Sequence, residues 1–147
     1  MAAENKIKFK IVTPERTVFE DQIDQVILPT ADGEITVLPN HIPLISVLQA
    51  GELIAKKDGE EIAMAVSGGI VEVRKNEMTI LADTAERAEE IDMERAEEAR
   101  ARAEKLKEEK IRSDETDYAT AAAILEKNLA RIKVAKKHLT RRGIKIE

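Results

Sequence analysis

The segment from residue 78 to residue 103 reads MTILADTAERAEEIDMERAEEARARA, and the character of the chain changes within it. All four prolines and five of the six glycines precede residue 83. From Thr84 to Arg142 there is no proline and no glycine, and Ala, Glu, Lys and Arg dominate. Because Gly and Pro separate short strands and interrupt helices, the sequence predicts a β domain over residues 1–85 and a helical hairpin over residues 86–147.

The first part has the pattern of short strands joined by tight turns. Ile7, Phe9 and Ile11 alternate with lysines, as expected for a half-buried strand. Asp58-Gly59 is typical of a β-hairpin turn. Ser67-Gly68-Gly69 also predicts a tight turn, since it lacks the length and the Gly-Lys-Ser/Thr ending of a phosphate-binding loop. We expect an α+β fold that begins with an antiparallel β-sandwich of about nine to ten strands.

The second part predicts two long helices that pair with each other. Two N-terminal caps are possible, Asp83 followed by Glu86 and the later Asp92. In the second helix an apolar seam includes Leu125, Leu129 and Ile132 at helical spacing. The docking of so narrow a hairpin on the sandwich is worth only a few kcal/mol, so we expect it to be detachable.

Charge divides the helical part into an acidic and a basic half. Residues 84–117 carry 13 acidic and 8 basic residues, whereas residues 118–147 carry 2 acidic and 8 basic ones. The two halves therefore attract each other. The same polarity allows the basic helix to pair with another acidic surface.

Composition excludes several classes of function. The net charge is −5, and the aromatic residues are only Phe9, Phe19 and Tyr118, so a nucleic-acid interface is not expected. The absence of cysteine excludes disulfides and thiolate metal sites. No apolar run reaches the length of a membrane span, and the N-terminus has no signal-peptide pattern. We expect the cytosol or an equivalent compartment.

No catalytic or metal site is expected. The two histidines, His41 and His138, are far apart and have no metal-ligand spacing around them. His41 stands between two prolines, where a structural role in a rigid corner is favoured. No nucleophile can be paired with a base, so the sequence predicts a non-catalytic protein.

One cluster of charges leaves two interpretations open. In the segment Ile91-Asp92-Met93-Glu94-Arg95-Ala96, spacing alone favours a helix cap with an exposed Arg95. Alternatively, Arg95 and Arg102 face Lys127 and Arg131 across the hairpin. Four such cations would repel one another unless an anion such as a nucleotide triphosphate lay between them.

Three segments resemble a known family: Leu38-Pro39-Asn40-His41-Ile42-Pro43-Leu44, Val66-Ser67-Gly68-Gly69-Ile70-Val71-Glu72-Val73 and Ile80-Leu81-Ala82-Asp83-Thr84-Ala85. In content and order they are similar to the epsilon subunit of bacterial F-type ATP synthases, over nearly the whole chain. The resemblance implies a non-catalytic central-stalk subunit that couples the gamma subunit to the c-ring. It also implies a hairpin that can extend toward the catalytic alpha and beta subunits and restrain ATP hydrolysis.

The resemblance also implies site residues. No cofactor is required, but ATP is a possible regulatory ligand, and its implied contacts are Glu86, Ile91, Asp92, Arg95, Ala96, Arg102, Lys127 and Arg131. Lys127 stands where the family has arginine. The c-ring contact maps to Asp32, Gly33 and Glu34, and a gamma contact maps to His41. Contacts of the extended hairpin with the catalytic subunits map to Arg131, Lys133, Lys136, Lys137, Arg141 and Arg142. In the loop region, Asn40 tolerates a left-handed conformation and Thr36 favours an extended one.

The implied location is peripheral, on the cytoplasmic face of the bacterial membrane, with membrane contact only through the complex. Two other classes remain open. One is a stand-alone nucleotide-sensing module, and the other is a β-sandwich ligand carrier with a helical oligomerisation arm. Co-purification with a large ATPase would distinguish an ATP synthase subunit from both of these alternatives.

Overall fold

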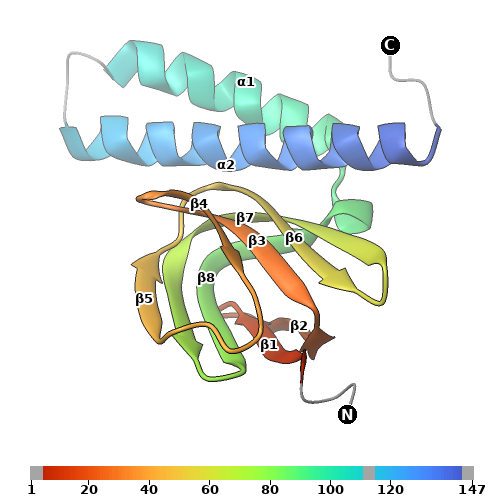
Figure 1. Ribbon diagram of the computed structural model, residues 1–147. Helices are drawn as coiled ribbons and strands as arrows, with labels where there is room; N and C mark the ends of the chain where they lie inside the picture. The colour runs from red at the N-terminus through yellow and green to blue at the C-terminus, as the bar shows by residue number, and fades with distance from the viewer. Residues whose placement is uncertain (1–4, 111–114, 144–147) are drawn as a thin grey trace.

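A β-sandwich lies beneath a pair of long helices in the computed structural model, which describes residues 5–110 and 115–143 (Figure 1). The strands are β1 (Ile7–Val12), β2 (Thr17–Ile23), β3 (Gln25–Thr30), β4 (Gly33–Val37), β5 (Leu44–Val47), β6 (Gly51–Lys57), β7 (Glu60–Arg74) and β8 (Glu77–Arg87). A short 3₁₀ helix, η2 (Ala88–Glu90), leads to α1 (Met93–Lys110) and α2 (Glu115–Arg141). The predicted fold class is confirmed.

The strands form one continuous sheet that folds over on itself. Its order is β2-β1-β8-β7-β6-β3-β4, and β5 pairs with β7 off this path. The neighbours are antiparallel, as expected, with one exception: β1 and β8 run parallel, with Lys8 opposite Glu77 and Val12 opposite Leu81. The first and last strands of the sandwich are therefore hydrogen-bonded to each other.

The long strand β7 explains why eight strands are seen where about nine to ten were expected. The predicted turn at Ser67-Gly68-Gly69 is wrong, because β7 continues through these residues. Gly68 and Gly69 have φ angles of +62° and +122°, which bend the strand without reversing it. The half of β7 before the bend pairs with β6, and the half after it pairs with β5, so β7 belongs to both layers.

The core of the sandwich is aliphatic around one aromatic pair. Phe9 and Phe19 lie with ring centroids 5.7 Å apart, and Phe9 is fully buried. Ile7, Phe9 and Ile11 all point into this core, as their alternation predicts. The hairpin turn at Asp58-Gly59 is confirmed, with both residues at positive φ.

The change from strand to helix occurs later than the first candidate cap. Asp83 and Glu86 lie within β8, so a helix cap at Asp83 is wrong. The cap at Asp92 is confirmed: the backbone N–H of Arg95 donates to Asp92 Oδ1 at 3.1 Å, and α1 begins at Met93. Residues 83–87 are part of strand β8 and not of a helix, because each of them except Asp83 is paired with a residue of β7.

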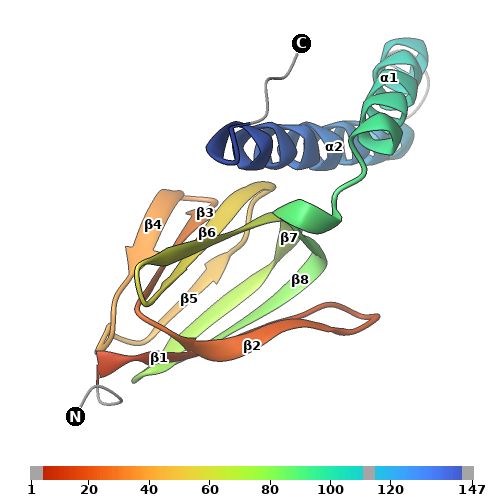
Figure 2. The same ribbon diagram turned by 90° about the vertical axis from the view of Figure 1, so that its right-hand side faces the viewer.

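The hairpin is docked through α2, which lies between the sheet and α1 (Figure 2). Val134 is fully buried against Ala63 and Ala65 of β7, with Ala88 and Ile91 completing the cluster. These small side chains bring the helix close to the sheet but bury little apolar area. A docked yet releasable hairpin is the physical expectation from such a contact.

The predicted apolar seam of α2 is only partly correct. Ile132 is buried, but Leu129 is 46% exposed, while Asn128 is 3% exposed. Helix α2 is covered both by α1 and by the sheet, whereas Leu129 shares the exposed side of the helix with Lys133 and Lys136.

Candidate functional site

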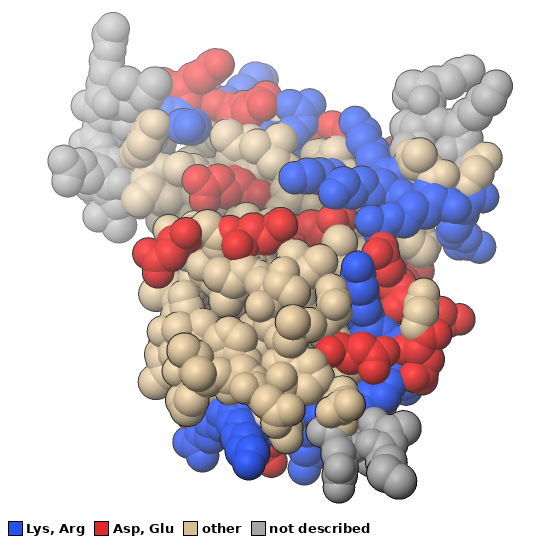
Figure 3. Space-filling model, in the orientation of Figure 1, with Lys and Arg blue, Asp and Glu red and all other residues tan. Residues whose placement is uncertain are grey.

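An apolar surface on the sandwich lies open to a partner. It comprises Leu38, Ile42, Ile45, Val47, Ile70 and Leu81, which are between 51% and 75% exposed, and we call it the apolar face. Val47 lies opposite Ile70 and Ile70 lies opposite Leu81, so three strands contribute to one row. In Figure 3 the side of the sandwich that carries β4 and β5 is largely free of charged side chains.

The corner that precedes β5 borders this face. His41 is half-buried between Leu38 and Ile42, and its backbone N–H donates to the Leu38 carbonyl at 3.2 Å. Asn40 has φ of +64°, as its tolerance of the left-handed region allows, and its N–H donates to Asn76 Oδ1 at 2.8 Å. The corner is thus fastened to the turn between β7 and β8, and His41 stands beside the apolar face.

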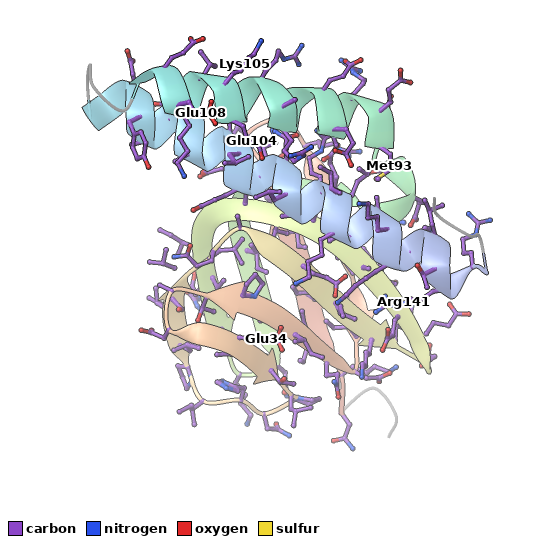
Figure 4. All side chains as sticks on the ribbon, turned by 90° about the horizontal axis from the view of Figure 1, so that it is seen from above. Glu34, Met93, Glu104, Lys105, Glu108 and Arg141 are labelled. Carbon is purple, nitrogen blue, oxygen red and sulfur yellow. The ribbon has the colours of Figure 1, made fainter. Side chains whose placement is uncertain are left out.

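The predicted c-ring contact is an exposed hairpin turn. Asp32 lies in the turn after β3, Gly33 and Glu34 begin β4, and all three are exposed. Thr30 is buried, and its hydroxyl donates to the Gly33 carbonyl at 2.6 Å, which holds the turn in shape. Thr36 is extended within β4, as expected. Glu34 projects from β4 in the view from above (Figure 4).

Beneath α2 a cavity of about 360 Å³ opens between three parts of the chain. It is lined by Thr13, Pro14, Glu15 and Arg16 from the β1–β2 loop, Asp83, Thr84, Ala85 and Glu86 from β8, and Lys127 and Arg131 from α2. Of the residues implied as ATP contacts, the structure brings Glu86, Lys127 and Arg131 together here. The volume lies in the range of small-molecule sites.

Within this cavity Arg131 is already engaged. Its Nε donates to Glu86 Oε2 at 2.6 Å and its Nη2 to Glu86 Oε1 at 3.3 Å, while Nη1 donates to Asn128 Oδ1 at 2.9 Å. The Arg131 and Glu86 side chains are only 17% and 30% exposed. Lys127, by contrast, takes part in none of the ion pairs found within residues 5–110 and 115–143.

The other implied ATP contacts lie around the start of α1. Asp92 caps this helix, Ala96 is fully buried, and Ile91 packs in the cluster around Val134. Arg95 and Arg102 are exposed on α1 and are not among the residues that line the cavity. The convergence of four cations suggested by the sequence is therefore limited, in this docked state, to Lys127 and Arg131.

The six cations implied as contacts with the catalytic subunits fall into two groups. Arg131, Lys137 and Arg141 pair with acidic residues of the sandwich, and we call these three the inward cations. Lys137 Nζ lies 2.9 Å from Glu52 Oε1, and Arg141 Nη2 lies 3.5 Å from Glu61 Oε2, near the end of α2 (Figure 4). Lys133, Lys136 and Arg142 are exposed, and we call them the outward cations.

Other kinds of site are not seen in the described part of the chain. No helix within residues 5–110 and 115–143 is long and apolar enough to cross a bilayer. The same residues hold no group of three or more His, Cys, Asp or Glu side chains that could bind a metal ion.

Sequence reasoning missed the apolar face and the β1–β2 loop at the cavity. A signal for the face was present, because Ile70-Val71 and Ile80-Leu81 are apolar at consecutive positions. Successive strand residues point to opposite sides, so such pairs indicate that both sides of the strand are apolar. No sequence pattern pointed to Arg16, whose place depends on how β1, β8 and α2 meet in space.

Comparisons with known proteins agree with this architecture. Residues 6–88 match the family described as "ATP synthase, Delta/Epsilon chain, beta-sandwich domain", and residues 89–136 match "ATP synthase, Delta/Epsilon chain, long alpha-helix domain". The ATP synthase epsilon chain of Dehalococcoides mccartyi strain CBDB1 is 48% identical over 132 residues, which cover 90% of this chain and 94% of that protein. That of Chloroflexus aggregans is 47% identical over 136 residues, which cover 92% and 96%.

Solved structures show the same fold at lower identity. A chain of the Euglena gracilis mitochondrial ATP synthase matches with a TM-score of 0.75 and 21% identity, over 90% of this chain and 82% of that one. A chain of the Tetrahymena thermophila mitochondrial ATP synthase central stalk and c-ring matches with a TM-score of 0.54 and 16% identity, over 91% and 98%. On the family matches and the relatives at 47% to 48% identity, the chain belongs to the ATP synthase epsilon chain family and is a non-catalytic subunit.

Proposed function

We propose that this chain is a central-stalk subunit that joins the gamma subunit to the ring of c subunits in a rotary ATP synthase. The observation that carries the proposal is the apolar face. Six large apolar side chains, each at least 51% exposed, are more than a soluble monomer usually shows in one area. In this proposal the gamma subunit covers the apolar face, with His41 at its border.

The turn of Asp32, Gly33 and Glu34 contacts the c-ring. Its carboxylates are exposed and its backbone is fixed by Thr30, so it presents two negative charges on a rigid hairpin. Polar loops of the ring are a suitable partner for such a turn. The subunit is then peripheral, on the cytoplasmic face of the bacterial membrane, and reaches the membrane only through the complex.

The central-stalk role can be tested by adding the protein back to an ATP synthase depleted of its epsilon subunit. Ile70→Glu places a charge in the middle of the apolar face and should weaken binding roughly tenfold or more, because that charge becomes buried in the interface. Thr17→Glu, at an exposed position of β2 outside the apolar face, is the matched control. Normal binding by a correctly folded Ile70→Glu protein would exclude the apolar face as the interface.

The helical hairpin restrains ATP hydrolysis when it leaves the sandwich and meets the catalytic alpha and beta subunits. The inward cations are occupied by Glu86, Glu52 and Glu61 in the docked state. These sandwich acids thus compete for the basic side chains that the catalytic subunits would bind. Docking and inhibition are therefore alternatives.

The two groups of cations allow the inhibition of ATP hydrolysis by the hairpin to be tested. Replacing the outward cations Lys133, Lys136 and Arg142 by Ala should raise ATPase activity of the assembled enzyme without loosening the docked hairpin. Replacing the inward cations should affect both properties. Unchanged activity with either set, in a complex that assembles normally, would rule out an electrostatic brake.

ATP is the regulatory ligand of the docked hairpin. Support comes from the cavity, where Glu86, Lys127 and Arg131 meet from two parts of the chain. A ligand that binds only the docked state stabilises it by about 2.7 kcal/mol at 100 times its dissociation constant. This is comparable to the few kcal/mol expected for docking.

Isothermal titration of the full chain with ATP, with and without magnesium, tests this part. Lys127→Arg should tighten binding, because the guanidinium can make two parallel hydrogen bonds to a phosphate. Arg95→Ala should weaken binding if Arg95 moves toward the ligand. No heat and no thermal shift at millimolar ATP would leave Asp92 as a helix cap and nothing more. The chain would then regulate without sensing nucleotide.

A further inference from the structure

The β1–β2 loop forms a wall of the cavity beneath α2 that no sequence motif indicated. The Thr13 backbone N–H donates to the Arg16 carbonyl at 2.9 Å, and the Arg16 N–H donates to the Thr13 hydroxyl at 3.3 Å. These bonds close a tight turn with Arg16 at its end. Arg16 therefore lines the cavity from the sandwich side, across from Lys127 and Arg131 on α2.

Arg16 is the arginine of this cavity that is most easily released. Its Nη2 lies 3.2 Å from Glu90 Oε2, and the two side chains are 54% and 42% exposed. Exposed pairs of this kind contribute little. Arg131 is held more firmly, by two hydrogen bonds to Glu86 in a less exposed position. A phosphate group would be a stronger partner for Arg16 than a single solvated carboxylate.

Formal charges around the cavity balance, because the acidic residues Glu15, Asp83 and Glu86 stand beside its three cations. An anion would therefore be held by direct hydrogen bonds rather than by an overall positive field. The affinity for an anion then depends on the cations that can donate hydrogen bonds to it from the β1–β2 loop and from α2. Arg16 supplies this contact from the sandwich, and Lys127 and Arg131 supply it from the hairpin.

We infer that Arg16 is a phosphate-binding residue of this site, so that a bound polyphosphate chain ties the sandwich directly to α2. The inference rests on the ATP part of the proposed function. It names a contact outside the residues that the family resemblance implied. When Arg16 turns to the ligand it leaves Glu90, so Glu90 competes with the phosphates for this side chain.

The experiment is isothermal titration of the full chain with ATP and, separately, with inorganic tripolyphosphate. Arg16→Ala should weaken binding of both probes roughly tenfold, which corresponds to about 1.4 kcal/mol. Arg74→Ala is the matched control, since Arg74 is an exposed arginine paired with Glu72 on β7 and stands outside the cavity. Glu90→Gln should leave the affinity unchanged or raise it.

The different outcomes expected for Arg16→Ala and Glu90→Gln separate ligand contact from a purely structural role. If the Arg16–Glu90 pair only stabilised the docked hairpin, Arg16→Ala and Glu90→Gln would weaken binding equally, and the inference would be overturned. It would also be overturned if Arg16→Ala bound normally while Arg131→Ala did not, although ATP sensing would then survive. If the wild-type chain bound neither probe, both the inference and ATP sensing would be rejected.

Discussion

Arg131 on α2 and Glu86 on β8 form a two-pronged ion pair, with Nε 2.6 Å from Oε2, that joins the hairpin to the sandwich. The two residues are 45 positions apart in the chain. Both belong to the residues implied as ATP contacts, yet here they bind each other. This ion pair thus stabilises the docked hairpin without a ligand.

Replacing Glu86 by Gln should loosen the docked hairpin. The change leaves the mostly buried Arg131 without its counter-charge, which costs about 1–3 kcal/mol. Amide hydrogen exchange of α2 should become faster, while exchange in β1 should not change. Glu89→Gln, three residues further along, is the control, because Glu89 is exposed and its ion pair, at 4.0 Å, is with Arg87 of the sandwich. Equal rates of amide exchange in α2 of both variants would show that the Arg131–Glu86 pair does not hold the hairpin on the sandwich.

Lys137→Met should weaken docking more than Lys136→Met. Lys137 is the partner of Glu52, whose side chain is 8% exposed and whose Oε2 atom has no hydrogen bond. Removing Lys137 leaves that carboxylate buried and unpaired, at a cost of about 1–3 kcal/mol, whereas Lys136 is exposed. The comparison can be made by the salt dependence of thermal unfolding. Two variants with the same melting behaviour would show that the Glu52 pair contributes nothing.

Gly69→Ala should be strongly destabilising. A Cβ at Gly69 would lie 2.0 Å from the Leu81 carbonyl oxygen, at a φ of +122° that other residues rarely adopt. The clash and the backbone strain together should cost more than about 4 kcal/mol. Gly59→Ala is the control, because Gly59 has φ of +83° but open space around its Cα. Chemical denaturation should place the two variants in this order, and similar midpoints would contradict the close approach of β7 and β8.

Acid should weaken the end of the sandwich where Lys6 lies 2.8 Å from Asp24 and 2.7 Å from Asp58. The Lys6 ammonium and the Asp58 backbone N–H lower the pKa of Asp24 below its ordinary 3.8. A lowered folded-state pKa contributes stability above the unfolded value, and this stability is lost as the pH falls through the folded one. The melting temperature should therefore decrease when the pH is lowered below about 4, and it should decrease less in Lys6→Met. If the melting temperature of Lys6→Met depended on pH in the same way as that of the wild type, the Lys6–Asp24 pair would not be the cause of the acid sensitivity.

A chain ending after Ala88 should fold without the hairpin, and one ending after Ala85 should be less stable. Residues 86 and 87 still pair with Ala65 and Met64 of β7, so the shorter chain loses the end of that ladder. Circular dichroism during heating would compare the two. Lack of a cooperative transition in the longer chain would show that sandwich and hairpin fold only together.

Local signals predicted the elements whose form is set by nearby residues. Alternation placed β1, the pair Asp58-Gly59 placed a hairpin turn, and Asp92 placed the start of α1. Each depends on contacts within a few positions of the chain. The distribution of glycine and proline predicted the order of sandwich and hairpin, and the resemblance to the epsilon family agreed with it.

Features that depend on distant parts of the chain were missed. Ser67-Gly68-Gly69 has the composition of a turn, but pairing with β8 on one side keeps it in a strand. Leu129 has the spacing of a buried residue, but α1 and the sheet cover other sides of α2 and Leu129 is exposed. Similarly, Arg16 reaches the cavity only because β1 lies next to β8. Tertiary contacts decide these positions, and no local pattern encodes them.

The parallel pairing of β1 with β8 has a consequence for synthesis on the ribosome. Strand β1 leaves the ribosome first, but its partner spans Glu77–Arg87, so one of its edges stays open until the whole sandwich sequence has emerged. Pairing between such distant segments is slow. The hairpin follows directly after the strand that closes this edge, and its helices can form from local contacts alone. The order of emergence therefore leaves α2 to settle on a sandwich that is already complete.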